Sequence, residues 1–393
     1  MTSRFGTIRR AALAAAAAGT LAFGATACGG SSDGGSSGGG GGEKIVIGWA
    51  PPSATGVFKT ATNYFDKALA GARAAGMDVE LTTRSPAAET DPQAQVSIVE
   101  DFITKKVDAI VVSPSDTQAI KPALRRANEA GIPVIMVNLL EDQPGVDVAS
   151  YIGFDNAEAA EVTAYSVLDY FGGPGVLGDG EKVDVPKDKK LDLAFWRDLY
   201  KDVDKASITA RGGQLQGVAG TLFAVERLKG FKTVFDQFPN AKTLGQPIAA
   251  DWERQKAVGA TEDLVSRFKD QMQFVWGSSS EMSIGAANVL ERRGLLDASG
   301  KPEKGKIAVF SNDVTPETAS LVKQGKIAAE TTHGFADWGW IGAQTAVRLV
   351  CGLPVEKKNN IGPRTVYPGN VDQYFPTPEQ PAIDWAAIKA ECK

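Results

Sequence analysis

The sequence predicts an α/β protein built from two doubly wound lobes, each with its own parallel sheet. From residue 43 onward, short apolar segments rich in β-branched residues alternate with segments of helical periodicity. This alternation is typical of a parallel sheet covered by helices on both faces. It occurs in two successive runs, and the roughly 350 residues that carry it are more than one hydrophobic core usually holds.

The N-terminal region has the features of an export signal followed by a tether. Three arginines precede the apolar run 11–27, which predicts a signal peptide over residues 1–27. Cys28 follows the small residues GATA, and this pattern resembles the lipobox of bacterial lipoproteins. We therefore expect Cys28 to carry a lipid. The Gly/Ser-rich segment 28–42 then forms a flexible tether. An uncleaved membrane anchor is the alternative, although the apolar run is shorter than the roughly 20 residues that span a bilayer.

The first run predicts four strands that alternate with three helices. We expect strands at 45–49, 78–81, 108–113 and 133–138, with helices near 60–75 and 91–106 and a third helix ending near residue 130. In the third unit Asp116 can cap the helix start, and Gly131 can end the helix. Pro122 is expected to kink this helix or delay its start.

The second run follows the same rhythm. We expect strands near 207–211, 243–249, 273–277, 306–310 and 326–331, and helices at 157–171, 220–236, 253–268, 281–293 and 315–324. Residues 172–206 interrupt this rhythm, and long excursions of this kind are usually functional or mobile. Ligands of doubly wound sheets bind beyond the carboxyl ends of the strands, so the loops there are the predicted site.

Charge and motif content exclude several classes of function. Removing residues 1–27 takes away three of the 42 basic residues and none of the 47 acidic ones, which leaves a net charge of −8. Such an acidic body argues against nucleic-acid binding. The chain has no phosphate-binding loop motif and no C-x-x-C pair, and one histidine cannot by itself supply a His-based zinc site. We therefore expect no cofactor and no metal.

Two cysteines remain after Cys28. Export places Cys351 and Cys392 in an oxidising compartment, where thiols tend to pair, so we expect a disulfide between them. Two free buried thiols are the alternative.

Five ordered motifs resemble the ribose/galactose-binding group of type I periplasmic binding proteins. The most specific is VVSPSDTQAIKPALRRANEAGIPVIMVN, which is similar to the group's "NPTDSDA–helix–ANxAGIPVI" signature. The others are YIGFDNAEAA, LQGVAGTLFAVERLKGF, SSEMSIGAANVLERRG and the pair NDVTPE and LVKQGKIAAE. This resemblance implies two Rossmann-like lobes with parallel sheets, joined by a three-crossover hinge. Lobe one would comprise 43–155 and 334–362, and lobe two 156–333 and 363–393.

The resemblance also implies a set of ligand contacts. Each matches a ligand-binding position of the family or lies in the corresponding loop: Ser53, Thr55, Phe58, Asn138, Arg227, Trp252, Ser279 and Asp313. Asn138 marks a departure, because the family typically has an Asp-Arg pair where this chain has Asn138-Leu139. Losing that arginine removes one fork of donors, and a linear polyol is one ligand that would fit the change.

His333, the only histidine, falls at the crossover where the family has a Gln or Asn ligand. An imidazole can donate from one nitrogen and accept at the other, as an amide does, so we expect His333 to contact a ligand hydroxyl. Asp337, Trp338 and Trp340 are rivals for this position.

The function that follows is capture of a monosaccharide or sugar alcohol by hinge closure, and delivery to the permease of an ABC transporter. The protein would be a monomer, lipid-anchored to the outer face of the cell membrane. A receptor that presents a sugar-like signal to a membrane sensor is an alternative. A secreted glycoside-acting enzyme is a further one, because Ser279, His333 and Asp313 supply the residue types of a catalytic triad.

Overall fold

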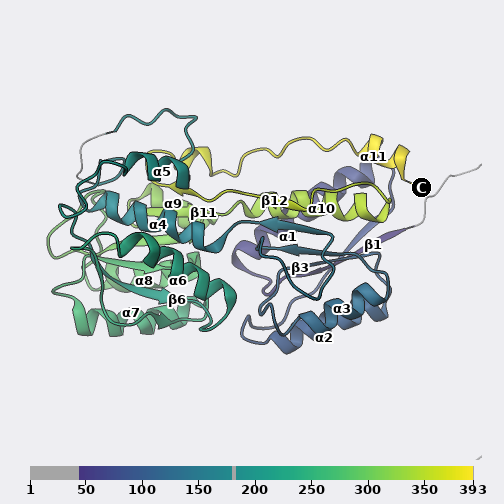
Figure 1. Ribbon diagram of the computed structural model, residues 1–393, viewed down its shortest axis with the longest axis horizontal. Helices are drawn as coiled ribbons and strands as arrows, with labels where there is room; N and C mark the ends of the chain where they lie inside the picture. The colour runs from purple at the N-terminus through teal and green to yellow at the C-terminus, as the bar shows by residue number, and fades with distance from the viewer. Residues whose placement is uncertain (1–43, 179–182, 393) are drawn as a thin grey trace, which may run out of the picture. The chain divides into compact units, whose positions relative to one another are not determined.

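Two sheets form the framework of the computed structural model, which describes residues 44–178 and 183–392 (Figure 1). In the first sheet all strand pairs are parallel, in the order β12-β5-β4-β3-β1-β2. The second sheet has the order β13-β11-β10-β9-β6-β7, with β8 also paired to β6. Only β13 runs antiparallel to its described neighbour in that sheet. The α/β class predicted from the sequence is confirmed.

Lobe one is the first sheet with helices on both faces. Its strands are β1 (Ile45–Ala50), β2 (Val79–Thr83), β3 (Ala109–Val112), β4 (Val134–Val137), β5 (Ser150–Gly153) and β12 (Lys358–Asn360). Helices α1 (Gly56–Ala74), α10 (Phe335–Val350) and α11 (Trp385–Glu391) pack on one face, and α2 (Pro92–Thr104) and α3 (Lys121–Glu129) pack on the other.

Lobe two is built on the second sheet. Its strands are β6 (Arg211–Gln216), β7 (Lys242–Thr243), β8 (Ile248–Ala249), β9 (Phe274–Gly277), β10 (Ala308–Asp313), β11 (Ala329–Thr332) and β13 (Arg364–Val366). One face carries α4 (Asn156–Tyr170), α5 (Leu193–Leu199) and α6 (Leu222–Phe235). The other carries α7 (Arg254–Phe268), α8 (Ser280–Arg292), α9 (Pro316–Lys323) and the 3₁₀ turn η1 (Val371–Gln373).

The third strand–helix unit forms as its sequence predicts. Every residue of β3 is buried, as expected for a central parallel strand. The Asp116 carboxylate accepts hydrogen bonds from the backbone N–H groups of Gln118 and Ala119, so it caps the turn before α3. Pro122 lies in the first turn of α3, where its missing N–H costs nothing, so it delays the helix start and does not kink it.

The segment 172–206 packs against lobe two where it is described. Its helix α5 buries Trp196 completely, and the Trp196 indole N–H donates to Thr365 Oγ1 at 2.9 Å. Thr365 lies on β13, so the insertion is tied to the strand that follows the third passage between the lobes. The described part of the insertion is thus a packed element of lobe two.

The end of the chain departs from the predicted lobe boundaries. The family resemblance places residues 363–393 wholly in lobe two, but Trp385 and Ile388 of α11 lie in the core of lobe one. Gly71 of α1 provides the room: a Cβ there would lie 2.8 Å from the Trp385 indole nitrogen. Within the described residues the chain therefore passes between the lobes a fourth time, after η1. Helix α11 is short, and its sequence does not reveal which apolar surface it covers.

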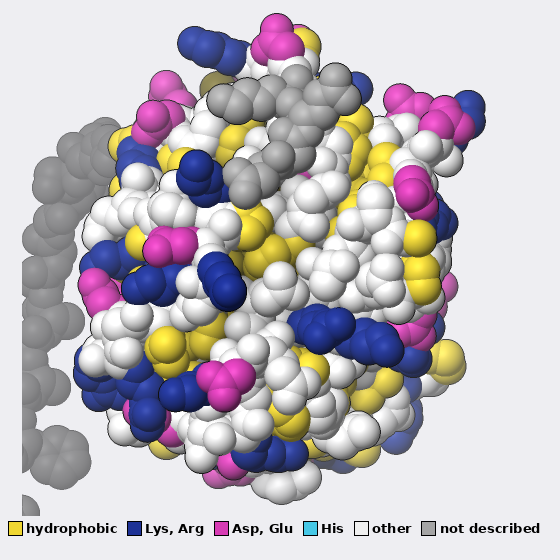
Figure 2. Space-filling view, turned by 90° about the vertical axis from the view of Figure 1, so that its left-hand side faces the viewer, with side chains coloured by type: hydrophobic (Ala, Val, Ile, Leu, Met, Phe, Trp, Pro, Cys, Tyr) yellow, Lys and Arg dark blue, Asp and Glu magenta, His cyan; other side chains and the backbone are white. Residues whose placement is uncertain are grey.

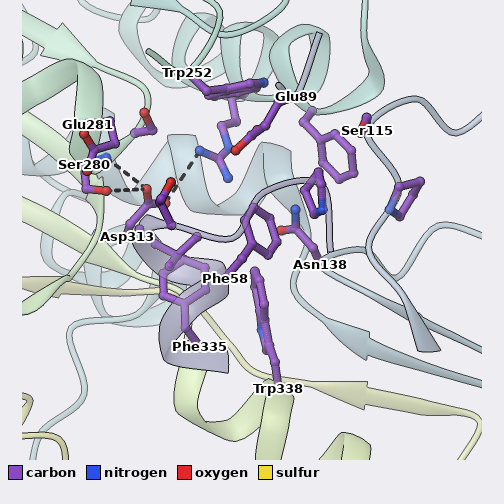
Figure 3. A pocket seen from close by; sticks show the side chains of 18 residues that line it. Phe58, Glu89, Ser115, Asn138, Trp252, Ser280, Glu281, Asp313, Phe335 and Trp338 are labelled. Carbon is purple, nitrogen blue, oxygen red and sulfur yellow. Dashed lines mark hydrogen bonds and ion pairs between the residues drawn. The ribbon is translucent and has the colours of Figure 1, made fainter. Parts of the chain in front are cut away.

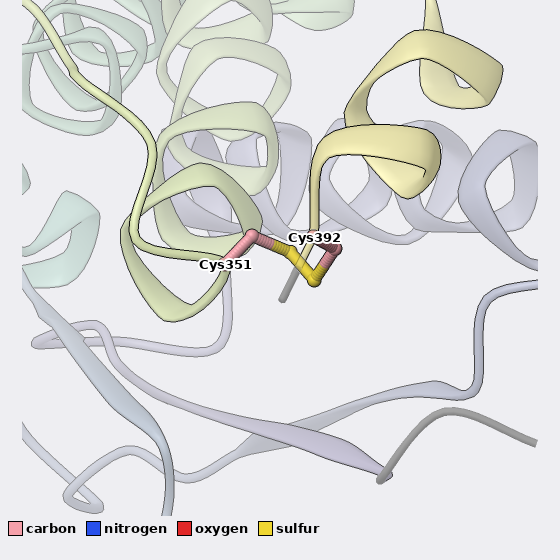
Figure 4. Close-up of a disulfide and its surroundings, with 2 residues drawn as sticks. All are labelled: Cys351 and Cys392. Atoms are coloured by element: carbon pink, nitrogen blue, oxygen red, sulfur yellow. A yellow bond between two sulfur atoms is a disulfide. The ribbon is translucent and has the colours of Figure 1, made fainter.

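Cys351 and Cys392 lie at the ends of α10 and α11, and their sulfur atoms are in contact as a disulfide pair (Figure 4). Their Cα atoms are 4.4 Å apart. Both helices pack on lobe one, so the pair joins two elements of the same lobe.

Candidate ligand-binding cavity

A cavity of about 100 Å³ is lined by residues of both lobes (Figure 3). Phe58, Asn138 and Trp338 come from lobe one, and Arg227 and Asp313 come from lobe two. Phe223 of α6 lies in a core cluster of lobe-one residues, so lobe two packs against lobe one beside the cavity. The lining combines aromatic faces with a few charged groups, as in many small-molecule sites.

Seven of the nine predicted ligand residues line this cavity. These are Thr55, Phe58, Asn138, Arg227, Trp252, Ser279 and Asp313. Ser53 does not line it, and its hydroxyl lies 3.0 Å from that of Thr55 in the exposed first loop. His333 does not line it either. Among the three rivals named for the crossover position, Trp338 is the one that reaches the cavity.

Arg227 is a buried guanidinium held in place by other groups of the protein. Its Nε–H donates to Asn156 Oδ1 at 3.0 Å, and Nη1 donates to the Ser278 carbonyl. The guanidinium also lies 5.2 Å from the Trp252 ring centroid and 5.8 Å from that of Phe154. Burial lowers the pKa of Arg227, while the nearby Asp313 carboxylate opposes that shift. These contacts leave the remaining donors of the fork available to a bound molecule.

Asp313 is the last residue of β10, and its carboxylate lies at the N-terminus of α8. Its Oδ2 accepts hydrogen bonds from the Ser280 backbone N–H at 2.9 Å and the Ser280 hydroxyl at 3.1 Å. Its Oδ1 lies 3.9 Å from Arg227 Nη1. Asp313 does not cap the following helix α9, because Thr315 caps it through a capping box with Thr318.

The backbone at Asp313 is strained. Asp313 has φ +118° and Val314 has φ +76°, a region that a β-branched residue adopts only when the surroundings hold it there. Buried Glu330 on the neighbouring strand β11 supports this turn, because its carboxyl group also faces Val314 and Thr318. With this backbone conformation the Asp313 side chain lines the cavity.

His333 lies beneath Asp313 and is fully buried. Its ring stacks on Phe154 with centroids 3.9 Å apart. Trp276 Nε1–H donates to Asn312 Oδ1 at 2.8 Å, which orients the amide so that Asn312 Nδ2 faces His333 Nε2 at 3.3 Å. An indole N–H can only donate, so this sequence of contacts makes Nε2 the acceptor and places the proton on Nδ1.

The protonated Nδ1 faces Asp313 Oδ1 at 3.4 Å, although it makes no hydrogen bond of good geometry. Burial lowers the pKa of His333 to about 4, so the ring is neutral at pH 7. In this geometry the His333 ring does not line the cavity, where the predicted contact to a ligand hydroxyl would be made. The sequence identifies the crossover segment, but it does not determine which side chains of that segment line the cavity and which point into the core.

Trp252 owes its place to two backbone features. Asp251 and Trp252 both have positive φ, at +51° and +66°. The indole packs over Gly217, where an added Cβ would lie 1.9 Å from a ring atom. The position of Trp252 in the cavity lining therefore depends on Gly217, which is distant in sequence.

Several lining residues were not anticipated from the sequence. They are Pro52, Gly56, Val57, Glu89, Pro114, Ser115, Phe223, Ser280, Glu281 and Phe335. Glu89 is the most informative, because its carboxylate extends into the cavity below Trp252 (Figure 3). Burial, reinforced by Asp313, raises the pKa of Glu89 to about 8. The only sequence signal for it is its position after the carboxyl end of β2.

In the described parts of the chain, no cluster of three or more His, Cys, Asp or Glu side chains is arranged to hold a metal ion. Likewise, none of the helices within those parts has the length and apolar character needed to cross a membrane. The face of lobe two drawn in Figure 2 carries acidic and basic side chains interspersed with one another.

Comparison with known proteins agrees with this geometry. Residues 55–354 match the family described as periplasmic binding protein domain. The ribose import binding protein of Bacillus subtilis is 26% identical over 270 residues, covering 69% of this chain and 72% of the relative. The xylitol-binding protein of Mycolicibacterium smegmatis is 26% identical over 291 residues, covering 72% and 70%.

Solved structures show the same fold. A solute-binding protein of Agrobacterium vitis with bound D-fucose has a TM-score of 0.67 at 22% identity, over 84% of this chain and 97% of that one. One from Bacillus halodurans with bound myo-inositol has a TM-score of 0.65 at 22% identity, over 86% and 98%. The chain thus belongs to the periplasmic binding protein family, and its fold is the type I architecture of two Rossmann-like lobes.

Replacing His333 tests its role as a support for Asp313. We expect His333→Ala to weaken ligand binding about tenfold, because the Asp313 carboxylate loses a neighbouring donor. It should also lower the free energy of unfolding by about 2–3 kcal/mol, because a buried ring is lost. His333→Gln keeps an amide donor and should retain more of the affinity. Titration calorimetry and denaturant unfolding measure both effects. An Ala variant that loses stability but keeps full affinity would contradict the supporting role.

Glu330 predicts a pH dependence of stability. It is fully buried, with Oε1 accepting from Ser311 Oγ at 3.0 Å, and burial raises its pKa from 4.5 to about 8. The folded state then binds more protons than the unfolded state, so this contribution is present in full below pH 4.5 and is lost as pH rises through about 8. The lowered pKa of His333 acts oppositely, but only between about pH 4 and 6.5.

We therefore expect the free energy of unfolding to fall between pH 6.5 and 8, with a slope of up to about 1.4 kcal/mol per pH unit for each such group. Glu330→Gln should flatten the slope, leaving a smaller part from Glu89. Urea unfolding at several pH values measures it. An unchanged slope in the variant would show that Glu330 is ionised in the folded protein.

Proposed function

We propose that this chain captures a monosaccharide or sugar alcohol outside the cytoplasm and delivers it to the permease of an ABC importer. The observation that carries the proposal is the Arg227–Asp313 pair, buried between aromatic side chains in a cavity lined by both lobes. A guanidinium donates to hydroxyl oxygens, a carboxylate accepts from hydroxyl hydrogens, and aromatic faces cover the C–H surface of a sugar. The named ligands of the relatives support this class of ligand.

Capture works by closure of the two lobes. A ligand that contacts Asn138 of lobe one and Arg227 and Asp313 of lobe two at once makes all of these contacts only in the closed form. It therefore shifts the population toward that form. The closed surface would be what the permease recognises, with the protein acting as a monomer. The predicted contacts, including Thr55, Phe58, Trp252 and Ser279, belong to this proposal.

The geometry gives no support to the enzymatic alternative. A triad would need the His333 ring beside the Ser279 hydroxyl. Instead Nδ1 faces Asp313 and Nε2 faces Asn312, while the Ser279 hydroxyl accepts from the backbone N–H of Met282 at the start of α8. The family consists of solute-binding proteins, which agrees with a binding function.

Export and anchoring complete the proposal. The predicted signal peptide, Cys28 and tether lie outside the described residues. The family supports a location outside the cytoplasm, and the sequence alone supports the signal peptide, the lipidation of Cys28 and the tether. We propose that lipidated Cys28 holds the protein at the outer face of the membrane, and that the Cys351–Cys392 pair is oxidised there. We propose that lobe one comprises 44–155, 334–362 and 385–392, and that lobe two comprises 156–178 and 183–333 with the 363–366 strand and η1.

A thermal-shift screen against sugars and polyols tests the function. A ligand at 100 times its Kd should add about 2.7 kcal/mol to the free energy of unfolding. Arg227→Met should abolish this stabilisation, because the buried donors are lost. Arg267→Met, which removes an exposed arginine on α7, should leave it intact. If no polyhydroxylated compound raises the melting temperature of the wild-type protein, the proposed function is wrong.

Mass spectrometry tests the maturation steps. The mature chain isolated from a bacterial membrane should begin at a Cys28 that carries a diacylglycerol, and Cys28→Ser should release the protein from the membrane. Cys351 and Cys392 should resist alkylation until a reductant is added. Detection of both thiols as alkylated without reductant would overturn the disulfide.

A further inference from the structure

Glu89 is the one acidic residue of the cavity lining that makes no hydrogen bond or ion pair with any other residue in the described ranges. Three carboxylates line the cavity: Glu89, Glu281 and Asp313. Glu281 forms an ion pair with Arg254 at 2.9 Å. Asp313 accepts from Ser280 and faces Arg227. Glu89 has only longer-range electrostatic interactions, and most of these are with other acids.

The ionisable side chains of the lining are therefore mostly acidic. Arg227 is the single cationic side chain of the lining. Its Nε and Nη1 groups donate to Asn156 and the Ser278 carbonyl, and Asp313 lies nearby. Ionising a carboxyl group that is largely removed from water and has no partner is costly unless a bound group compensates for the charge. Neutral hydroxyls compensate in part, whereas a positive charge compensates in full.

The aromatic side chains around Glu89 also favour binding of a cation. Trp252 lies over Glu89, and Phe58, Phe335 and Trp338 lie on other sides of the cavity (Figure 3). The negative faces of aromatic rings attract cations, most strongly when water is excluded. A carboxylate together with several aromatic rings is thus a setting that stabilises an ammonium group.

We propose that the cavity selects a polyhydroxylated ligand that carries an ammonium group, such as an amino sugar or an amino polyol, with the ammonium group paired to Glu89. The hydroxyls of that ligand would contact Arg227 and Asp313. This inference rests on the proposed function and narrows its ligand class.

Proton linkage gives an independent readout. With the cavity empty, Glu89 is surrounded by Asp313, Glu253 and Glu281 and by one opposing cation, Arg227, and burial holds its pKa near 8. At pH 7 it is then mostly protonated. Pairing with an ammonium ion favours the carboxylate form, so binding should release a proton, whereas a neutral sugar should release none at this position.

Calorimetric titration of the wild-type protein with matched pairs tests the proposal. The pairs are D-glucosamine with D-glucose, D-galactosamine with D-galactose, and an amino polyol with its parent polyol, each measured at pH 7 in two buffers of different ionisation enthalpy. In at least one pair we expect the amine to bind about tenfold tighter or more, with close to one proton released. Glu89→Gln should abolish both the preference and the proton release. Glu129→Gln, which changes an exposed residue of α3, should retain both.

The outcomes separate this inference from the function on which it rests. If neutral sugars bind as tightly as their amine counterparts, or if Glu89→Gln weakens both members of a pair equally, the ammonium proposal is wrong and the solute-binding function stands. If no member of any pair binds, and the wider sugar and polyol screen is also negative, both are wrong. An unchanged melting temperature of ligand-free Glu89→Gln shows that the variant folds.

Discussion

A guanidinium buried among aromatic rings needs compensating groups, and the arrangement around Arg227 supplies them. Taking a charge out of water costs several kcal/mol, which is recovered only if its donors are satisfied and an opposite charge is near. Asn156 and the Ser278 carbonyl accept from Arg227, and Asp313 provides the opposite charge. These partners come from the start of α4, the end of β9 and the end of β10. One buried charge thus fixes where three elements of lobe two meet.

The contacts of Asp313 connect the Arg227 site to the hinge. Its carboxylate is anchored by Ser280 on one side and faces His333 on the other, and His333 is oriented through Asn312 by Trp276. The strained backbone at Asp313 and Val314 is tolerated because this surrounding network holds it. His333 and the N-cap Gly334 precede α10, which returns the chain to lobe one. The ligand-facing carboxylate and the hinge therefore share one buried polar network.

The sequence predicts much of this arrangement where local chemistry determines the structure. Continuous apolar strands and capped helices identify β3, α3 and β4, and motif positions identify Arg227, Trp252 and Asp313. Three features could not be predicted from the sequence. Whether His333 faces the cavity or the core depends on side-chain direction at a crossover, which spacing along the chain does not determine. Glu89 is one polar residue in a polar loop, and only its approach to a cavity formed by distant segments distinguishes it. The sequence of helix α11 does not show which surface the helix packs on, because the space that Gly71 leaves for Trp385 forms only in the folded lobe.

The account makes the Arg227–Asp313 pair the anchor of a ligand held by both lobes, and a crystal structure of the protein with a ligand from the sugar and polyol screen tests this most directly. The account predicts that oxygen atoms of that ligand lie within hydrogen-bonding distance of both the Arg227 guanidinium and the Asp313 carboxylate, and that the same molecule contacts lobe one. A ligand bound outside the cavity, or in contact with one lobe alone, would contradict the account.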